Sequence, residues 1–112
     1  MIKLSPEPSF KSEIEIQCEL YNRLILIGLH CRMEVKQNCE CRGARFDIVV
    51  YHKNRRPTII EVKRRRSKRY KDNDNYHKYL KFDADIVMCC GESEIGLAVK
   101  KVSKLLNDEV KL

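Results

Sequence analysis

Two acidic residues and a lysine interrupt a pair of apolar, strand-like runs in the middle of the chain. Asp47 lies within the run RFDIVVY, and Glu61 and Lys63 lie within TIIEVK. Two carboxylates on a rigid frame are oxygen ligands of the kind that Mg²⁺ prefers. A metal ion held there polarises a phosphate ester and lowers the pKa of a bound water. These residues, with help from the Val62 carbonyl, therefore predict a metal site for phosphodiester hydrolysis, in which Lys63 orients or deprotonates the water.

The connection between the two runs, HKNRRP, is short enough to predict a β-hairpin. With a turn centred near Asn54, paired residue numbers sum to about 108, which places Asp47 opposite Glu61 at a separation of about 5 Å. Like charges held that close are destabilising unless a cation lies between them. The alternative is an ordinary acid–base pairing with Lys63 on a solvated face of the hairpin.

The elements that position these residues are predicted from periodicity and capping signals. The 112 residues suit one domain, with a tail over residues 1–11 and a single domain over residues 12–112. Ser12 and Glu15 form a capping-box pattern that begins a helix, and Gly28 ends it. Further elements are strands near residues 29–36, 45–51 and 57–63, a short helix near 75–82, a strand from 85, and a final amphipathic helix. The order α-β-β-β-α-β-α predicts an α/β fold, a single mixed β-sheet flanked by helices able to cover both faces.

The first helix aims two polar residues into its apolar side. At 100° per residue, Glu13 and Gln17 fall inside the apolar arc, whereas Glu15 and Glu19 fall on the solvent side. Glu13 and Gln17 are therefore candidates to complete the site, with Gln17 acting through a hydrogen bond to a metal-bound water. In the alternative interpretation Glu13 turns outward at the first turn and Gln17 is a hydrogen-bonded core residue.

Positive charge is concentrated directly after Lys63. The chain has 23 Lys and Arg against 16 Asp and Glu, and residues 63–82 carry nine basic and two acidic residues. Such a run favours a polyanionic partner, although it also fits a solvated surface or a localisation signal. The residues predicted to contact nucleic acid phosphates are Arg64, Arg65, Arg66, Lys68 and Arg69. Tyr76 and Tyr79 are candidates to stack on bases or sugars, the alternative being packing at the rim of the core.

The motifs RFDIVVY and IIEVK, with the preceding helix SEIEIQCELYNRLILIG, resemble the PD-(D/E)XK nuclease superfamily. This superfamily has a restriction-endonuclease-like fold and includes Holliday-junction resolvases. The resemblance spans about residues 12 to 106 and implies catalytic roles for Asp47, Glu61 and Lys63, with Phe46 where the family name has proline. It also implies a Mg²⁺-dependent endonuclease that acts on DNA, with Mn²⁺ able to replace Mg²⁺. The alternative is a non-catalytic nucleic-acid-binding module on the same fold.

Cysteine usage and chain length bear on compartment and assembly. Six cysteines without a charged-then-apolar leader predict a reducing compartment such as the cytoplasm. No apolar run approaches the roughly 20 residues that span a bilayer. A zinc site from Cys39, Cys41, Cys89 and Cys90 is a third hypothesis, although their spacing is not that of zinc knuckles. Because the chain barely exceeds a catalytic core, we expect a homodimer.

Overall fold

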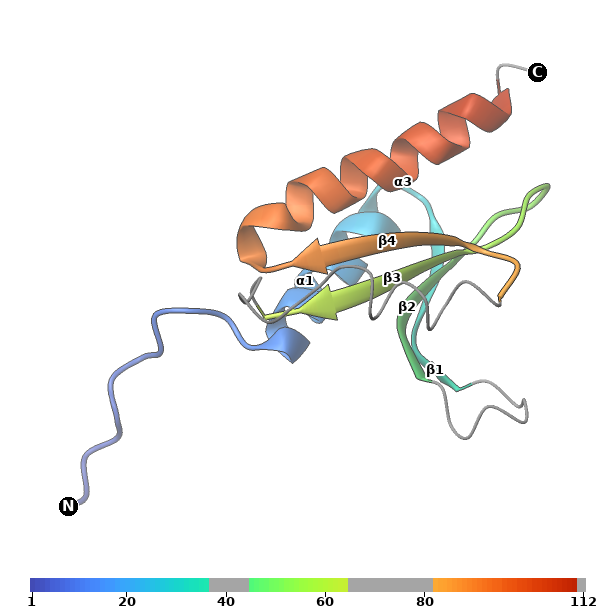
Figure 1. The fold of residues 1–112 in the computed structure, drawn as a ribbon. Coiled ribbons are helices and arrows are strands. Elements are labelled where there is room, and N and C mark those ends of the chain that lie inside the picture. The colour runs from blue at the N-terminus through green and yellow to red at the C-terminus, as the bar shows by residue number, and fades with distance from the viewer. Residues whose placement is uncertain (37–44, 65–81, 111–112) are drawn as a thin grey trace.

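The computed structural model describes residues 1–36, 45–64 and 82–110. Its elements are α1 (Glu13–Leu26), β1 (His30–Lys36), β2 (Arg45–Tyr51), β3 (Thr58–Lys63), β4 (Asp85–Cys90), the 3₁₀ turn η1 (Glu92–Glu94) and α3 (Ile95–Val110). The strands form one mixed sheet in the order β1-β2-β3-β4, antiparallel except for the parallel pair β3–β4 (Figure 1). The chain is therefore α/β, as predicted. The helix predicted near residues 75–82 falls almost entirely outside the described residues.

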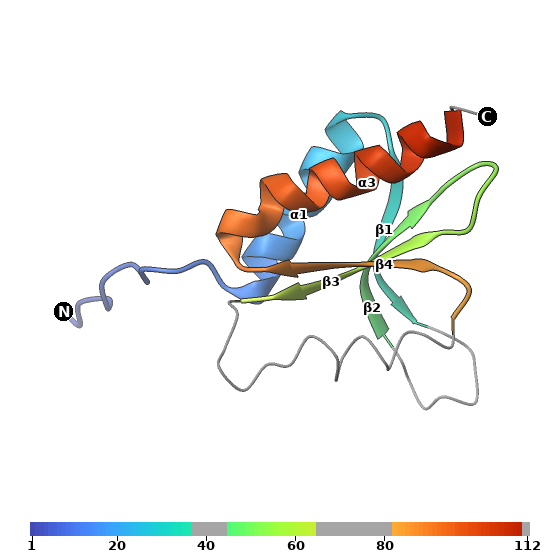
Figure 2. The same cartoon turned by 45° about the horizontal axis from the view of Figure 1, so that its top comes forward.

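Both described helices lie on one face of the sheet (Figures 1 and 2). There α1 and α3 bury apolar side chains, such as Leu20 and Val102, against Ile48 and Ile60 of the central strands. The opposite face holds a smaller cluster around Phe46. The prediction that helices cover both faces therefore does not hold for α1 and α3, because both present their apolar stripes to the same side.

The ends of α1 follow the capping signals in the sequence. The Ser12 hydroxyl accepts a hydrogen bond from the Glu15 N–H at 3.3 Å, and the Glu15 carboxylate accepts one from the Ser12 N–H at 3.3 Å. At the other end Gly28 takes φ +89°, and the Leu29 N–H donates to the Leu24 carbonyl, five residues back. Only glycine adopts that left-handed conformation without a penalty. The predicted bounds of this helix are confirmed.

The β2–β3 hairpin has the predicted register. Its paired residues are Ile48 with Ile60, Val49 with Ile59, and Val50 with Thr58. Each pair of numbers sums to 108, so one further step along the ladder leads to Asp47 and Glu61. The hairpin prediction is confirmed as far as the ladder extends.

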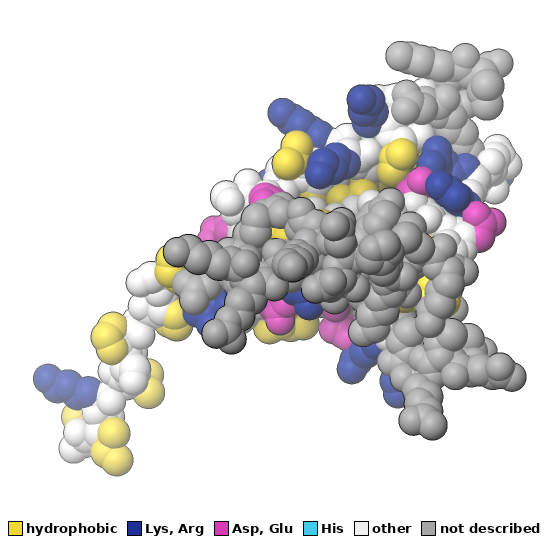
Figure 3. Space-filling view, viewed as in Figure 1, with side chains coloured by type: hydrophobic (Ala, Val, Ile, Leu, Met, Phe, Trp, Pro, Cys, Tyr) yellow, Lys and Arg dark blue, Asp and Glu magenta, His cyan; other side chains and the backbone are white. Residues whose placement is uncertain are grey.

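The N-terminal residues 1–12 have no helix or strand and run away from the body of the protein (Figure 1). Lys and Arg side chains gather along α3, where Lys100, Lys101 and Lys104 are exposed (Figure 3). The apolar side chains of the N-terminal segment are also exposed. Lys11 joins this segment to the body through ion pairs with Glu19 and Glu92. Among the described residues, no helix is both long and apolar enough to cross a bilayer.

Candidate active site

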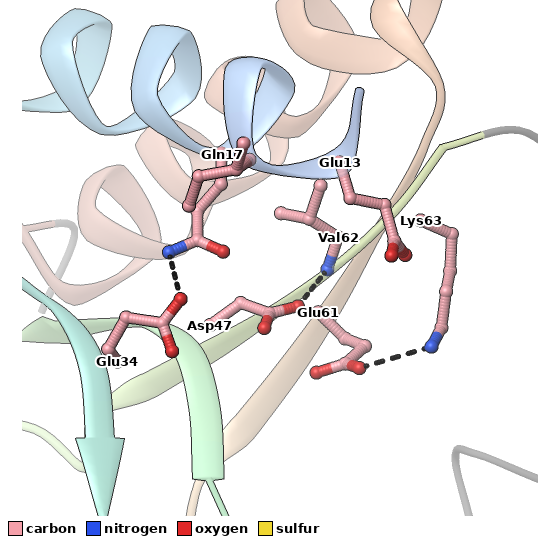
Figure 4. A pocket seen from close by; sticks show the side chains of 8 residues that line it. Glu13, Gln17, Glu34, Asp47, Glu61, Val62 and Lys63 are labelled. Atoms are coloured by element: carbon pink, nitrogen blue, oxygen red, sulfur yellow. Dashed lines mark hydrogen bonds and ion pairs between the residues drawn. The ribbon is translucent and has the colours of Figure 1, made fainter. Parts of the chain in front are cut away.

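A cavity of about 240 Å³ opens where β2 separates from β3, beside the first turns of α1. Four of the eight side chains that line it are carboxylic acids. The lining residues are Glu13, Ile14 and Gln17 of α1, Glu34 of β1, Asp47 of β2, and Glu61, Val62 and Lys63 of β3 (Figure 4). The cavity thus combines the D…E-x-K residues with both inward-facing polar residues predicted for the first helix.

Asp47 is anchored to the neighbouring strand through its side chain. The regular β2–β3 ladder ends at the pair Ile48–Ile60, and one residue farther on the Asp47 Oδ2 accepts a hydrogen bond from the Val62 N–H at 2.8 Å. A carboxylate oxygen is a stronger acceptor than a backbone carbonyl oxygen. A hydrogen bond to a charged group contributes about 1.5–3 kcal/mol to stability. This bond fixes the Asp47 carboxylate over β3, next to Glu61.

The orientation of β1 changes at Glu34. Met33 packs in the helix-side core, yet Val35, two residues on, packs in the cluster on the opposite face. Side chains two apart share a face in a regular strand. Glu34 lies between them with φ +58°, the left-handed region, and this conformation places Glu34 on the same side as Met33.

The partner strand makes the same change at the same level. Ile48 belongs to the helix-side core, whereas Phe46 packs edge-on against Phe82 on the other face, with ring centroids 5.0 Å apart. Asp47 lies at this break in the alternation, where its carboxylate reaches the Val62 N–H and lines the cavity beside α1.

Asp47 lies in an environment that opposes its charge. Burial raises the pKa of Asp47, and the nearby Glu34 charge raises it further. The Val62 N–H, a hydrogen bond with the Glu61 side chain, and the Lys63 charge act in the other direction but do not compensate fully. A buried carboxylate beside other carboxylates gains most from a bound cation.

Lys63 and Glu61 share the outer side of the cavity. The Lys63 Nζ lies 3.5 Å from the Glu61 Oε1, and Glu61 is only 8 % exposed. They come from alternate positions of β3, so both side chains project from the same side of the strand. An ammonium group is thus held within reach of the space in front of the two carboxylates (Figure 4).

Of the two polar residues predicted to face inward, Gln17 is buried, whereas Glu13 is exposed at the first turn of α1. Gln17 is 4 % exposed and its Nε2 donates to the Glu34 Oε1 at 3.0 Å, while Glu13 lines the outer edge of the cavity. Glu15 is exposed, and Glu19 lies outside the cavity, paired with basic side chains. The buried stripe of the helix is narrow, and Ile14, Ile25 and Ile27 are exposed.

Glu34 is the site residue that sequence reasoning missed. A lone acid in a predicted strand gives no signal, because a regular alternation does not distinguish it from a solvated residue. Arg64 follows the site and is exposed. The remaining predicted contacts to nucleic acid, Arg65, Arg66, Lys68, Arg69, Tyr76 and Tyr79, lie outside the described residues, as do Cys39 and Cys41 of the zinc hypothesis.

The donor set suits a hard divalent cation that retains its own water. Among residues 1–36, 45–64 and 82–110, no three His, Cys, Asp or Glu side chains come close enough together to form a complete metal-binding group. Mg²⁺ is usually bound through one or two carboxylates, several waters and the phosphate oxygens of a substrate. Asp47, Glu61 and the Val62 carbonyl supply oxygen donors of that kind, and burial, together with the charge of Glu34, raises the pKa of Asp47.

No family model, curated protein or solved structure matches this chain.

Proposed function

We propose that this protein is a metal-dependent deoxyribonuclease, an endonuclease of the PD-(D/E)XK type with a restriction-endonuclease-like core. One observation carries the proposal. The Asp47 carboxylate accepts a hydrogen bond from the N–H of Val62, which lies between Glu61 and Lys63 in the sequence. These four residues line one open cavity. The proposal includes the full α-β-β-β-α-β-α order, a cytoplasmic, reducing location, and assembly as a homodimer.

The side chains have separable roles in this proposal. Asp47, Glu61 and the Val62 carbonyl hold Mg²⁺, which when bound polarises the scissile phosphate and acidifies a water. Lys63 removes a proton from the attacking water or offsets the negative charge that grows on the phosphate. Gln17 hydrogen-bonds a water at the inner wall. Hydrolysis then joins the water oxygen to phosphorus and releases the leaving oxygen with a proton.

A run of basic residues begins at Arg64, directly after Lys63 in the sequence. In this proposal the basic side chains bind phosphates that flank the reacting one, without regard to sequence. DNA is therefore the proposed partner, and the contacts that place it are distinct from those that cleave it.

The test is an assay of the purified protein on plasmid, linear duplex, single-stranded and four-way-junction DNA, with Mg²⁺, Mn²⁺, Ca²⁺ or a chelator. We expect cleavage with Mg²⁺ and Mn²⁺, which suit the same ligands, and binding without turnover with Ca²⁺. Salt-dependent DNA binding without cleavage of any substrate would instead support the non-catalytic binding module.

A further inference from the structure

The amide of Gln17 offers two chemically different ends to its surroundings. Its Nε2 carries two donors and its Oε1 is an acceptor, and the hydrogen-bonding neighbours decide which end points where. Gln17 is almost fully buried, and its Nε2 donates to Glu34 at 3.0 Å. The oxygen end then points to the Asp47 side of the cavity (Figure 4).

The acceptor that selects this orientation is itself fully engaged. One oxygen of Glu34 accepts from Gln17, and the other forms an ion pair with Arg45 at 2.5 Å. An ionised carboxylate has no donor, so it can face only the NH₂ end of Gln17. The ion pair with Arg45 holds the second oxygen of Glu34 in place.

The backbone of Glu34 is held in an unfavourable conformation to reach this position. A left-handed φ costs a residue with a Cβ about 1–2 kcal/mol. This conformation turns Glu34 to the helix side, where it meets Gln17 instead of solvent. Strained residues of this kind gather at functional sites.

We infer that Glu34 is a positioning residue that locks the Gln17 amide with its carbonyl oxygen facing the cavity, as an acceptor for the bound cation or its water. The inference rests on the proposed function for the identity of that cation. It assigns Gln17 the same acceptor role that a carboxylate would have on this helix.

The test compares Mn²⁺ affinity, measured by calorimetry on the protein without DNA, across matched variants. Glu34→Asp keeps the charge but is one methylene shorter, and aspartate tolerates a positive φ better than glutamate does. Glu34→Gln keeps the shape, but Arg45 takes its amide oxygen, so its NH₂ would face Gln17 and reverse the Gln17 amide. The double variant Gln17→Glu, Glu34→Gln restores an acceptor oxygen toward the cavity. Glu19→Asp, on the outer side of α1, is the control.

We expect both single Glu34 variants to weaken Mn²⁺ binding about tenfold, the usual effect of losing a partner that orients a ligand. The double variant should bind within about threefold of the original protein, and Glu19→Asp should bind equally well. If Glu34→Asp binds Mn²⁺ like the original protein, only charge matters and the inference is wrong.

A second readout separates this inference from the proposed function. The side-chain NH₂ resonances of Gln17 should show slow exchange with solvent in the metal-free protein and lose that protection in Glu34→Asp. If the original protein binds no Mn²⁺, the proposed function fails, and these resonances still report on the amide lock. Unchanged Gln17 resonances in Glu34→Asp would contradict the inference that Glu34 holds the Gln17 amide in one orientation.

Discussion

Asp47 and Asp85 lie near opposite ends of β3, and each is only partly exposed. Their surroundings shift the pKa values of the two carboxyl groups in opposite directions. Asp85 accepts hydrogen bonds from Arg55 and from Arg56, the latter at 2.8 Å. Burial alone would raise the pKa of Asp85, but the two guanidinium groups outweigh it and hold the pKa below its ordinary value. At Asp47 burial and the Glu34 charge prevail, and the pKa is raised.

The contrast separates a structural carboxylate from one that is a candidate for function. Two arginines form ion pairs with Asp85, and these pairs connect the β2–β3 turn to the start of β4. The charge at Asp47 is compensated only in part, by one backbone N–H and one lysine that is shared with Glu61. A pKa perturbed by burial and like charges in an open cavity is typical of active sites.

The largest expected difference between the two residues is in DNA cleavage. Asp47→Asn should reduce the Mg²⁺-dependent cleavage rate by at least the roughly 10²- to 10⁴-fold associated with losing a group that acts on the reacting atoms. Asp85→Asn should cleave at close to the original rate. Single-turnover rates on one DNA substrate would measure both, and equal losses would erase the distinction.

Lys63 and the arginines that follow it should differ next most. Lys63→Ala should lower the cleavage rate by roughly 10²- to 10⁴-fold with little change in DNA affinity. Joint replacement of Arg64, Arg65 and Arg66 by alanine should weaken binding to all sequences and reduce the salt slope by about one unit per lost phosphate contact. Filter binding over a range of salt, beside cleavage rates, separates the two effects. A Lys63→Ala protein that loses affinity as strongly as the arginine variant would argue against a role in the reaction.

In stability the order of the two aspartates should reverse. Asp85→Asn should lower the free energy of unfolding by about 1–3 kcal/mol, because it leaves the partly buried Arg55 without its carboxylate. Asp47→Asn should leave the free energy of unfolding unchanged or higher in metal-free protein, since asparagine still accepts from the Val62 N–H and carries no charge. Urea unfolding at neutral pH measures both. Marked destabilisation by Asp47→Asn would show that this carboxylate is structural.

A smaller effect should appear in the pH dependence of stability. The lowered pKa of Asp85 gives a stabilisation present above the ordinary value of 3.8 and lost as the pH falls through the folded-state pKa. The raised pKa of Asp47 has the opposite sign: its contribution is full below 3.8 and lost as the pH rises through the folded-state pKa. Asp85→Asn should therefore weaken the dependence of stability on pH at acid pH. Asp47→Asn should become more stable relative to the original protein only at a pH above the folded-state pKa of Asp47. Parallel profiles would contradict both assignments.

Local signals in the sequence predicted much of this arrangement. The short hairpin connection determined the register that leads to Asp47 and Glu61, and the capping box together with helix phase predicted that Gln17 points inward. These features depend on a few neighbouring residues and on fixed periodicities.

The rest depends on contacts between distant segments. The regular alternation of β1 and β2 breaks at Glu34 and Asp47, because Met33 and Ile48 pack on the helix side whereas Val35 and Phe46 pack on the other. Neither the left-handed backbone of Glu34 nor its bond to Gln17 has a sequence signature. The placement of α1 and α3 on the same face likewise follows from packing between them, which no local pattern encodes.

Mg²⁺ binding tests most directly whether the uncompensated charge at Asp47 belongs to a cation site. At Mg²⁺ concentrations about 100 times Kd, a ligand bound only by the folded state adds about 2.7 kcal/mol to the free energy of unfolding. We predict a gain of that size for the original protein and for Asp85→Asn, and none for Asp47→Asn. An equal gain for Asp47→Asn, or no gain for any of the three proteins, would contradict this account of the site.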